Sequence, residues 1–215
     1  MVAASAGIPP EECLFLMSQA ITATPRTGNA GSTTTWTLDP AHTDILFSAK
    51  HMMVTTVRGT FRDVEGSLSL DEADPTRSSA TVRVATGSLD TANQQRDGHL
   101  RSADFFDAEN HPWLEFRSTS VAHVRGDEYR ITGDLTIRET TRPITFDATL
   151  LGFYTGMQGQ RRVGIAARTK INRKDWGLNW NVALEAGGWL VGEDIKIEVE
   201  VAADLAGAEQ ATAAA

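Results

Sequence analysis

The chain has 215 residues, 41% hydrophobic and 22% charged, which fits one globular all-β domain or two small ones. Its formal net charge of −8 disfavours a nucleic-acid partner, because such proteins need a basic surface. A single cysteine, Cys13, excludes an internal disulfide and a cysteine-rich metal site, and no apolar run is long enough to span a bilayer.

The start of the chain does not follow the pattern of the rest. Residues 18–35 are rich in Thr, Ala, Gly and Ser, which predicts a flexible leader over residues 1–35. The leader begins with no basic segment, and its apolar stretch Cys13–Met17 is too short for the core of a signal peptide. We therefore expect a cytoplasmic protein, with Met17 as an alternative start to Met1.

Short apolar–polar segments predict strands in the first half of the chain, where order should begin near Trp36. The expected strands are Asp44–His51, Val57–Leu70 and Ser79–Thr86, with a turn at Asp74-Pro75 between the last two. The alternation then stops in a charged segment. This change predicts a short helix near residues 92–106, capped by Asp90 or Thr91.

Alternation is regular in the second half of the chain, where side chains of each segment point to opposite faces of a strand. The expected strands are Trp113–Val121, Glu128–Arg138, Arg142–Leu150, Arg161–Ile171 and Glu193–Val201. Each has one dry face and one wet face. The last two are separated by a loop over residues 172–192 that is dense in Trp, Asn and Gly, and an Ala-rich tail over residues 205–215 is expected to be disordered.

These segments make eight strands, joined mainly by short antiparallel connections. Such strands form either a sandwich or a closed barrel, and alternation alone does not choose between the two. The interior of an eight-stranded barrel is either filled by side chains or holds one small ligand.

Several motifs occur along the chain in a specific order. They include Trp36–Pro40, Arg96–Asp107, Gly133–Ile137 and Ile171–Gly177. In these motifs, which cover a domain over residues 36–204, the chain resembles the YceI-like family of lipocalin-like, polyisoprenoid-binding proteins. The resemblance implies an extended eight-stranded antiparallel up-and-down barrel. It also implies non-enzymatic binding, storage or transport of a long-chain isoprenoid or similar amphiphile. Many relatives are periplasmic, a setting that the absence of an evident export signal does not support here.

The apolar residues that alternation turns inward are the candidate ligand-binding residues. The large ones are Phe47, Phe61, Phe116, Ile131, Leu135, Phe146, Ile165 and Ile197, and the small ones are Ala49, Gly133, Ala148 and Ala167. Small residues inside an eight-stranded barrel leave room for a ligand unless large neighbours fill it. An open tunnel and a solid interior are therefore both consistent with the pattern.

Charged and aromatic residues outside the strands are candidates for the mouth of the barrel. They are Arg96, His99, Arg101, Arg173, Trp176 and Trp180. Cationic groups suit an anionic head group, and tryptophans suit a lid or a membrane contact. The alternative is structural. In it Arg96 and Asp97 pair with strand ends, Phe105 and Phe106 plug the barrel, the tryptophans are core, and Arg173 pairs with Asp175.

Metal ions, cofactors and catalysis are not expected. His42, His51, His99 and His111 follow no metal-ligand spacing, and no nucleophile elbow, phosphate loop or dinucleotide fingerprint is present. An enzyme acting on a hydrophobic substrate would need a polar pair inside the barrel, such as His51 with Asp44. A structural barrel without a ligand would have no tunnel. Besides the lipid, a transient membrane contact and a homodimer are the interactions considered.

Overall fold

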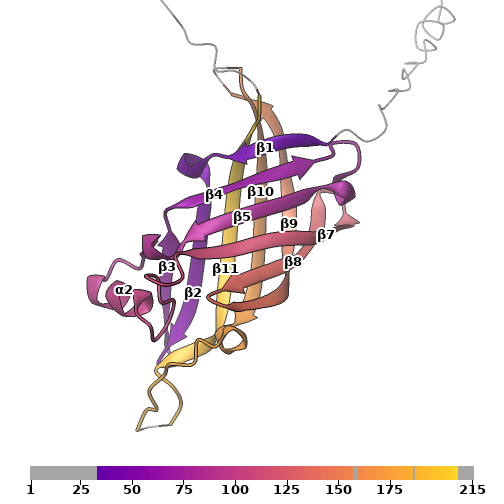
Figure 1. Ribbon diagram of the computed structural model, residues 1–215. Coiled ribbons are helices and arrows are strands. Elements are labelled where there is room, and N and C mark those ends of the chain that lie inside the picture. The colour runs from indigo at the N-terminus through magenta and orange to yellow at the C-terminus, as the bar shows by residue number, and fades with distance from the viewer. Residues whose placement is uncertain (1–32, 157–158, 186, 208–215) are drawn as a thin grey trace, which may run out of the picture. The chain divides into compact units, whose positions relative to one another are not determined.

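The computed structural model of the chain describes residues 33–156, 159–185 and 187–207. The strands of this part are β1 Thr34–Leu38, β2 Asp44–His51, β3 Thr55–Phe61, β4 Val64–Leu70, β5 Ser79–Ala85, β6 Leu89–Asp90, β7 Trp113–Arg125, β8 Glu128–Ile137, β9 Thr140–Thr155, β10 Arg161–Asn172 and β11 Val191–Leu205 (Figure 1). Its helices are α2, Gln94–Arg101, and the 3₁₀ turns Pro40–His42, Pro75–Arg77, Thr86–Ser88 and Arg173–Trp176. None of the described helices is both long and apolar enough to cross a membrane.

The expected leader and tail lie outside the described residues, apart from their inner ends. β1 begins at Thr34, two residues before the expected start of order at Trp36, and β11 continues to Leu205. These two ends pair with each other, since Trp36 lies opposite Leu205.

Eight of the described strands form a closed antiparallel barrel. The order around the ring is β1-β4-β5-β7-β8-β9-β10-β11, and β11 pairs with β1 to close it. From β7 to β11 each strand pairs with the next along the chain, as in an up-and-down barrel. The expected eight-stranded antiparallel barrel is therefore confirmed, and the sandwich alternative is wrong.

The expected long strand Val57–Leu70 is two strands, β3 and β4, interrupted at Arg62 and Asp63. β3 pairs with β2, whereas β4 pairs with β1. A corner at Asp39–Thr43 likewise separates β1 from β2, and the single strand β11 pairs with both. The breaks between β1 and β2 and between β3 and β4 thus occur at the same place in the sheet. Because of this, β1 stays paired with β4 and β2 stays paired with β3.

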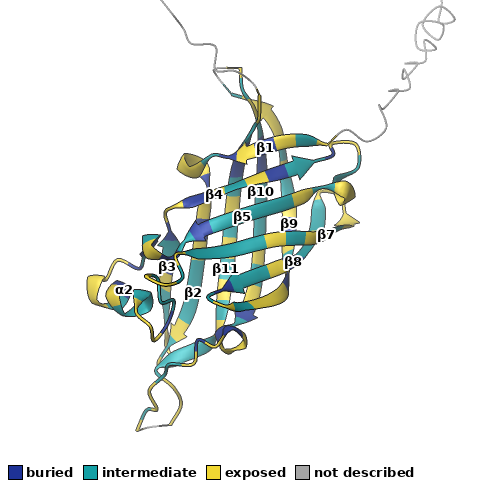
Figure 2. Ribbon diagram, in the orientation of Figure 1, coloured by how far each residue is buried: buried dark blue, intermediate teal, exposed yellow. Residues whose placement is uncertain are grey.

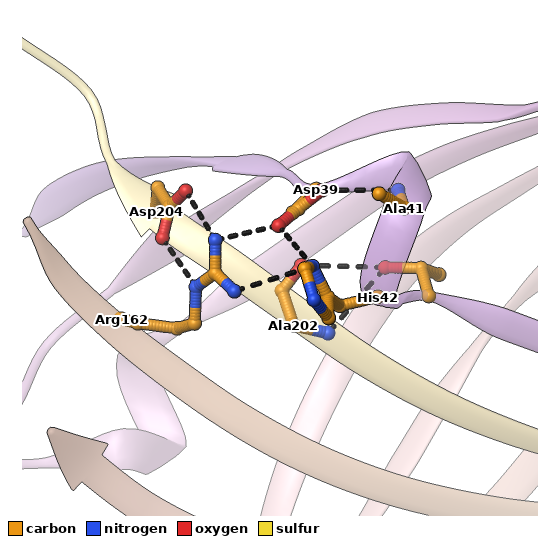
Figure 3. A network of polar contacts seen from close by, with 7 residues as sticks. Asp39, Ala41, His42, Arg162, Ala202 and Asp204 are labelled. Carbon is orange, nitrogen blue, oxygen red and sulfur yellow. Dashed lines mark hydrogen bonds and ion pairs between the residues drawn. The ribbon is translucent and has the colours of Figure 1, made fainter. Parts of the chain in front are cut away.

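A mostly buried arginine holds the corner at which the barrel closes (Figure 3). Arg162 in β10 donates from Nε and Nη2 to the carboxylate of Asp204 in β11, at 2.7 and 2.8 Å. Its Nη2 also donates to Asp39 Oδ2 at 2.5 Å. Asp39 Oδ1 accepts a bond from the Ala41 backbone at 3.0 Å, and His42 Nδ1 lies 2.7 Å from Oδ2, the oxygen that Arg162 also contacts. One guanidinium thereby joins β10, β11 and the corner that follows β1.

The network shifts the pKa values of Asp39 and Arg162. Burial alone would raise the pKa of Asp39, but the hydrogen bonds from His42 and Ala41 and the charge of Arg162 lower it below its ordinary value of 3.8. The hydrogen bonds to Asp204 raise the pKa of Arg162. Both groups are therefore charged at neutral pH, and the bonds between them are charge-assisted.

Buried apolar residues of the described chain gather in two clusters. The larger contains the fully buried Trp36, Leu89 and Val163, and the smaller contains Ile137 and Ile171. Elsewhere the strands alternate between intermediate and exposed residues (Figure 2). Many side chains that point into the barrel are therefore only half-buried, because the interior is not packed solid.

Replacing Arg162 by Ala should lower the free energy of unfolding by about 3 kcal/mol, because two carboxylates lose a shared partner that is 14% exposed. Urea unfolding followed by tryptophan fluorescence would measure this loss. As a control, Arg125→Ala removes an exposed pair with Glu128 and should leave the free energy of unfolding almost unchanged. Equal losses in the two variants would contradict the closing role of Arg162.

Asp39 should make part of the free energy of unfolding depend on pH. Because its pKa is lowered on folding, its contribution is fully present above the ordinary value of 3.8 and is lost as the pH falls through the lowered folded pKa. Asp39→Asn should therefore reduce the free energy of unfolding more at about pH 7 than at about pH 3. Urea titrations at both pH values measure the difference, and an equal loss at both would show that the charge of Asp39 is unimportant.

Candidate functional site: a cavity inside the barrel

The barrel encloses a cavity of about 760 Å³ with an almost wholly apolar wall. The wall is made of side chains at alternate strand positions, such as Phe47 on β2, Ile131 on β8 and Ile197 on β11. These three side chains are half-buried although they point inward, because they border the hollow. The volume lies within the ~300–1,000 Å³ typical of sites for small molecules.

All the predicted cavity residues except Gly133 line the hollow. They are Phe47, Ala49, Phe61, Phe116, Ile131, Leu135, Phe146, Ala148, Ile165, Ala167 and Ile197. Gly133 is buried instead, and a Cβ added there would lie 2.5 Å from a ring atom of Phe116. The space that Gly133 leaves is therefore taken by an aromatic ring. Ala148 and Ala167, which pair across β9 and β10, do border the cavity.

Some lining residues were not among the predicted cavity residues. His51 follows Phe47 and Ala49 at the same alternation on β2, and Tyr129 precedes Ile131 in the same way on β8. Both residues lie within the expected strands, so following the alternation to the strand ends would have placed them in the cavity. Lining residues from irregular segments, such as Leu178, carry no such periodic signal.

Helix α2 covers one end of the cavity, and side-chain hydrogen bonds fix its start. The N-cap is Asn93, whose side chain accepts from the Arg96 backbone at 3.0 Å. The expected caps are wrong because Asp90 accepts from Ala92, while the Thr91 hydroxyl donates to the buried Asp97 at 2.5 Å. Arg96 lines the cavity and also donates from Nε and Nη2 to Thr91, at 2.7 and 2.8 Å.

Arg101 lies at the end of α2 and is not among the residues that line the cavity. Its Nε donates to the Gly87 carbonyl at 2.9 Å, and its Nη2 donates to the Leu89 carbonyl. Arg101 therefore ties the helix to β6, which is a structural role.

An aromatic cluster lies at the same end. The ring of His99 meets those of Trp180 and Phe105 edge-on, with centroids 4.4 and 5.2 Å apart, and all three residues line the cavity. His99 Nε2 lies 3.0 Å from Asp104 Oδ2. Phe106 packs edge-on against Phe61 at 5.8 Å. These rings cover the end of the barrel with favourable aromatic contacts.

Arg173 is a buried cation at the edge of the cavity, with 2% of its surface exposed. It donates to the carbonyls of Gly192 at 3.1 Å, of Val191 at 3.5 Å and of Leu178, rather than to Asp175. Burial lowers the pKa of Arg173, yet a guanidinium keeps its proton in proteins. The cavity thus has a permanent positive charge beside it.

Trp176 is core rather than mouth. It is 3% exposed, and its Nε1 donates to the Leu135 carbonyl at 3.0 Å. It packs with Ile137 and Ile171 in the smaller cluster. Of the two candidate tryptophans, only Trp180 lines the cavity.

The described residues hold no group of three or more His, Cys, Asp and Glu side chains that could bind a metal ion. His42 lies beside Asp39. His51 faces the cavity, but Asp44 is exposed and is not a lining residue, so the polar pair considered for an enzyme is not formed.

Arg101→Ala should lower the free energy of unfolding by about 2 kcal/mol, because two carbonyls lose a charged donor. The affinity of this variant for an anionic and for a neutral amphiphile should change by the same factor, since Arg101 does not line the cavity. Competition binding with a carboxylate and an alcohol of equal chain length would measure both affinities. A larger loss for the carboxylate would place Arg101 at the head group after all.

Comparison with known sequences assigns the barrel-forming part of the chain to one protein family. A family model described as the YceI-like domain matches residues 36–203. A UPF0312 protein of Staphylococcus epidermidis is 39% identical over 166 residues, covering 77% of this chain and 94% of that protein. A UPF0312 protein of Staphylococcus aureus is 36% identical over 166 residues, with the same 77% and 94% coverage.

Solved structures share the barrel. The YceI protein of Campylobacter jejuni is 28% identical with a TM-score of 0.62, covering 72% of this chain and 88% of its own. BcnA of Burkholderia cenocepacia has a TM-score of 0.65 at 21% identity, covering 77% and 98%. A polyisoprenoid binding domain of Saccharophagus degradans has a TM-score of 0.58 at 12% identity, covering 79% and 98%. The last two are too distant in sequence to indicate more than a shared fold.

Proposed function

This chain belongs to the YceI-like domain family, and we propose that it binds a long-chain amphiphile, such as an isoprenoid lipid, inside its barrel without acting on it as an enzyme. The observation that carries the proposal is the apolar cavity of about 760 Å³. Storage or transport of the lipid is the role that this binding would serve. The cytoplasmic location expected from the sequence stays a prediction.

The energetics of burial favour an apolar chain as the ligand. Burying about ten methylenes at ~0.8 kcal/mol each would contribute ~8 kcal/mol, which corresponds to roughly micromolar affinity before ordering costs. A long apolar tail therefore needs no specific polar contact in order to bind. An apolar tail therefore suits a cavity whose wall has few polar groups.

Charged residues near α2 suggest where a head group would lie. Arg96, His99, Arg173 and Trp180 all line the cavity. Within the described chain, neither Arg96 nor Arg173 forms an ion pair with a carboxylate, because both donate to neutral oxygens. An anionic head group would supply the opposite charge that their present acceptors lack. We therefore place the head group near α2 and the tail among the β-strands.

Two alternatives are less well supported. A structural barrel without a specific ligand predicts a filled interior, which the open cavity argues against. An enzyme acting on a hydrophobic substrate predicts an acid–base pair facing the cavity, and the pair suggested by the sequence is not assembled. Binding without catalysis accounts for the apolar wall with fewer assumptions.

Protein purified natively from its host should carry an extractable long-chain lipid, which mass spectrometry of the organic extract would identify. Ala167→Phe should reduce the lipid per chain by about fivefold or more, because its ring would occupy the cavity. The matched control is Ala166→Phe on the outer face, where Ala166 pairs with the exposed Glu200. This control should keep its lipid.

Two results would contradict the proposal. One is a wild-type protein that neither carries lipid nor takes up an added long-chain lipid. The other is an equal lipid content in the Ala167→Phe and Ala166→Phe variants, which would place the lipid outside the cavity.

A further inference from the structure

A group of exposed apolar side chains lies beside the α2 end of the cavity. We call it the apolar tip. It consists of Met52, Met53 and Val54 in the turn between β2 and β3, with Val182 and Trp189 between β10 and β11. Their exposed fractions are 47, 63, 78, 45 and 48%, in that order. Large apolar groups this exposed and this close together mark an interaction surface.

Backbone contacts join the two segments of the tip. The Met52 backbone donates to the Leu190 carbonyl at 2.8 Å, and His51 lies opposite Val191 in the ladder between β2 and β11. A Cβ added at Gly188 would lie 3.7 Å from Cγ of Met53. The two segments therefore form one surface, at the lower end of the barrel in Figure 1.

The apolar tip adjoins the cavity. His51, Trp180 and Leu190 line the cavity, and each lies within two residues of a member of the tip along the chain. The exposed residues Lys50 and Asn93 also line it, so the cavity reaches the surface at this end. A molecule that enters here passes the apolar tip.

The backbone of the tip is unusual for the side chains that it presents. Met52 and Met53 have φ values of 51° and 62°, in the left-handed region that favours Gly and Asn. Both side chains are exposed, so little burial offsets this strain. Strained positions of this kind persist where they serve a function, and here they direct two flexible apolar side chains outward.

We propose that the apolar tip docks on a lipid bilayer, from which the ligand of the barrel enters. The inference rests on the proposed function, since a long-chain lipid is collected from a membrane rather than from water. Met, Val and Trp side chains suit the boundary between head groups and acyl chains. Lys50 is exposed next to the tip, so a cationic end is available for phosphates there, whereas Lys174 is paired with Glu193.

The extent of the tip favours a bilayer over a protein partner. A standard protein interface buries about 800 Å² on each side, more than five partly exposed side chains provide. Shallow insertion into a bilayer needs only a few apolar side chains. The tip is also built from a turn and a loop, with Val54 as much as 78% exposed, rather than from a flat sheet face.

Flotation of the full chain with phosphatidylcholine vesicles tests the proposal. A Met52→Asn, Met53→Asn, Trp189→Ser variant should reduce the partition onto vesicles by about tenfold or more. Asn suits the left-handed backbone of the turn, so thermal unfolding should show that the variant stays folded. The matched control replaces Val124 and Leu151 by Ser, at exposed positions in β7 and β9, and should float like the wild type.

Uptake of a fluorescent long-chain lipid separates docking from binding. If the proposal holds, wild type and tip variant take up lipid equally from cyclodextrin, but only the wild type takes it up rapidly from vesicles. A wild type that loads from cyclodextrin but does not float would overturn the docking alone. Failure to load from either source would overturn the proposed function. Self-association that the tip variant loses, without flotation of the wild type, would assign the tip to a second copy of the chain and overturn the bilayer proposal.

Discussion

The interior of this protein depends on one strand, β11, which pairs with β10 and also with two further strands in turn. Its first part pairs with β2 and its last part with β1, while the Asp39–Thr43 corner lies between these two partners. Without this pairing the sheet would keep free edges and its apolar face would meet water. Arg162 supports the junction because it bonds to β11 and to the corner at the same time. A charge-assisted network on the outside thus maintains an apolar space inside.

Closure around eight strands encloses a volume that the side chains do not fill. Which parts of the interior stay open depends on which large residue lies beside which small one. Gly133 leaves a gap that the Phe116 ring occupies, whereas Ala148 and Ala167 border open space. Among the described residues, most buried apolar side chains pack in the clusters around Trp36 and Ile171. An apolar ligand that binds only the folded barrel would therefore add stability that the interior does not provide by itself.

The cavity end near α2 combines three kinds of residue. Arginines tie irregular segments to carbonyls, aromatic rings close over the hollow, and exposed apolar side chains extend past the rim. The same guanidinium can hold a loop and leave its charge without a carboxylate partner, as Arg173 does. For this reason structural and ligand-binding roles are compatible at this end rather than exclusive.

The sequence by itself determined most of the strands and their inward faces, although it missed β1 and merged β3 with β4, and the resemblance of its motifs implied the closed barrel. It could do so because alternation is a local property, in which each side chain points opposite to its neighbour along the chain. Only the tertiary structure decided that Phe116 fills the gap at Gly133 and that Arg101 serves Gly87 and Leu89. It also decided that the turn at Met53 meets the loop at Gly188. Those outcomes depend on contacts between segments far apart in the chain, whose distances no local pattern specifies.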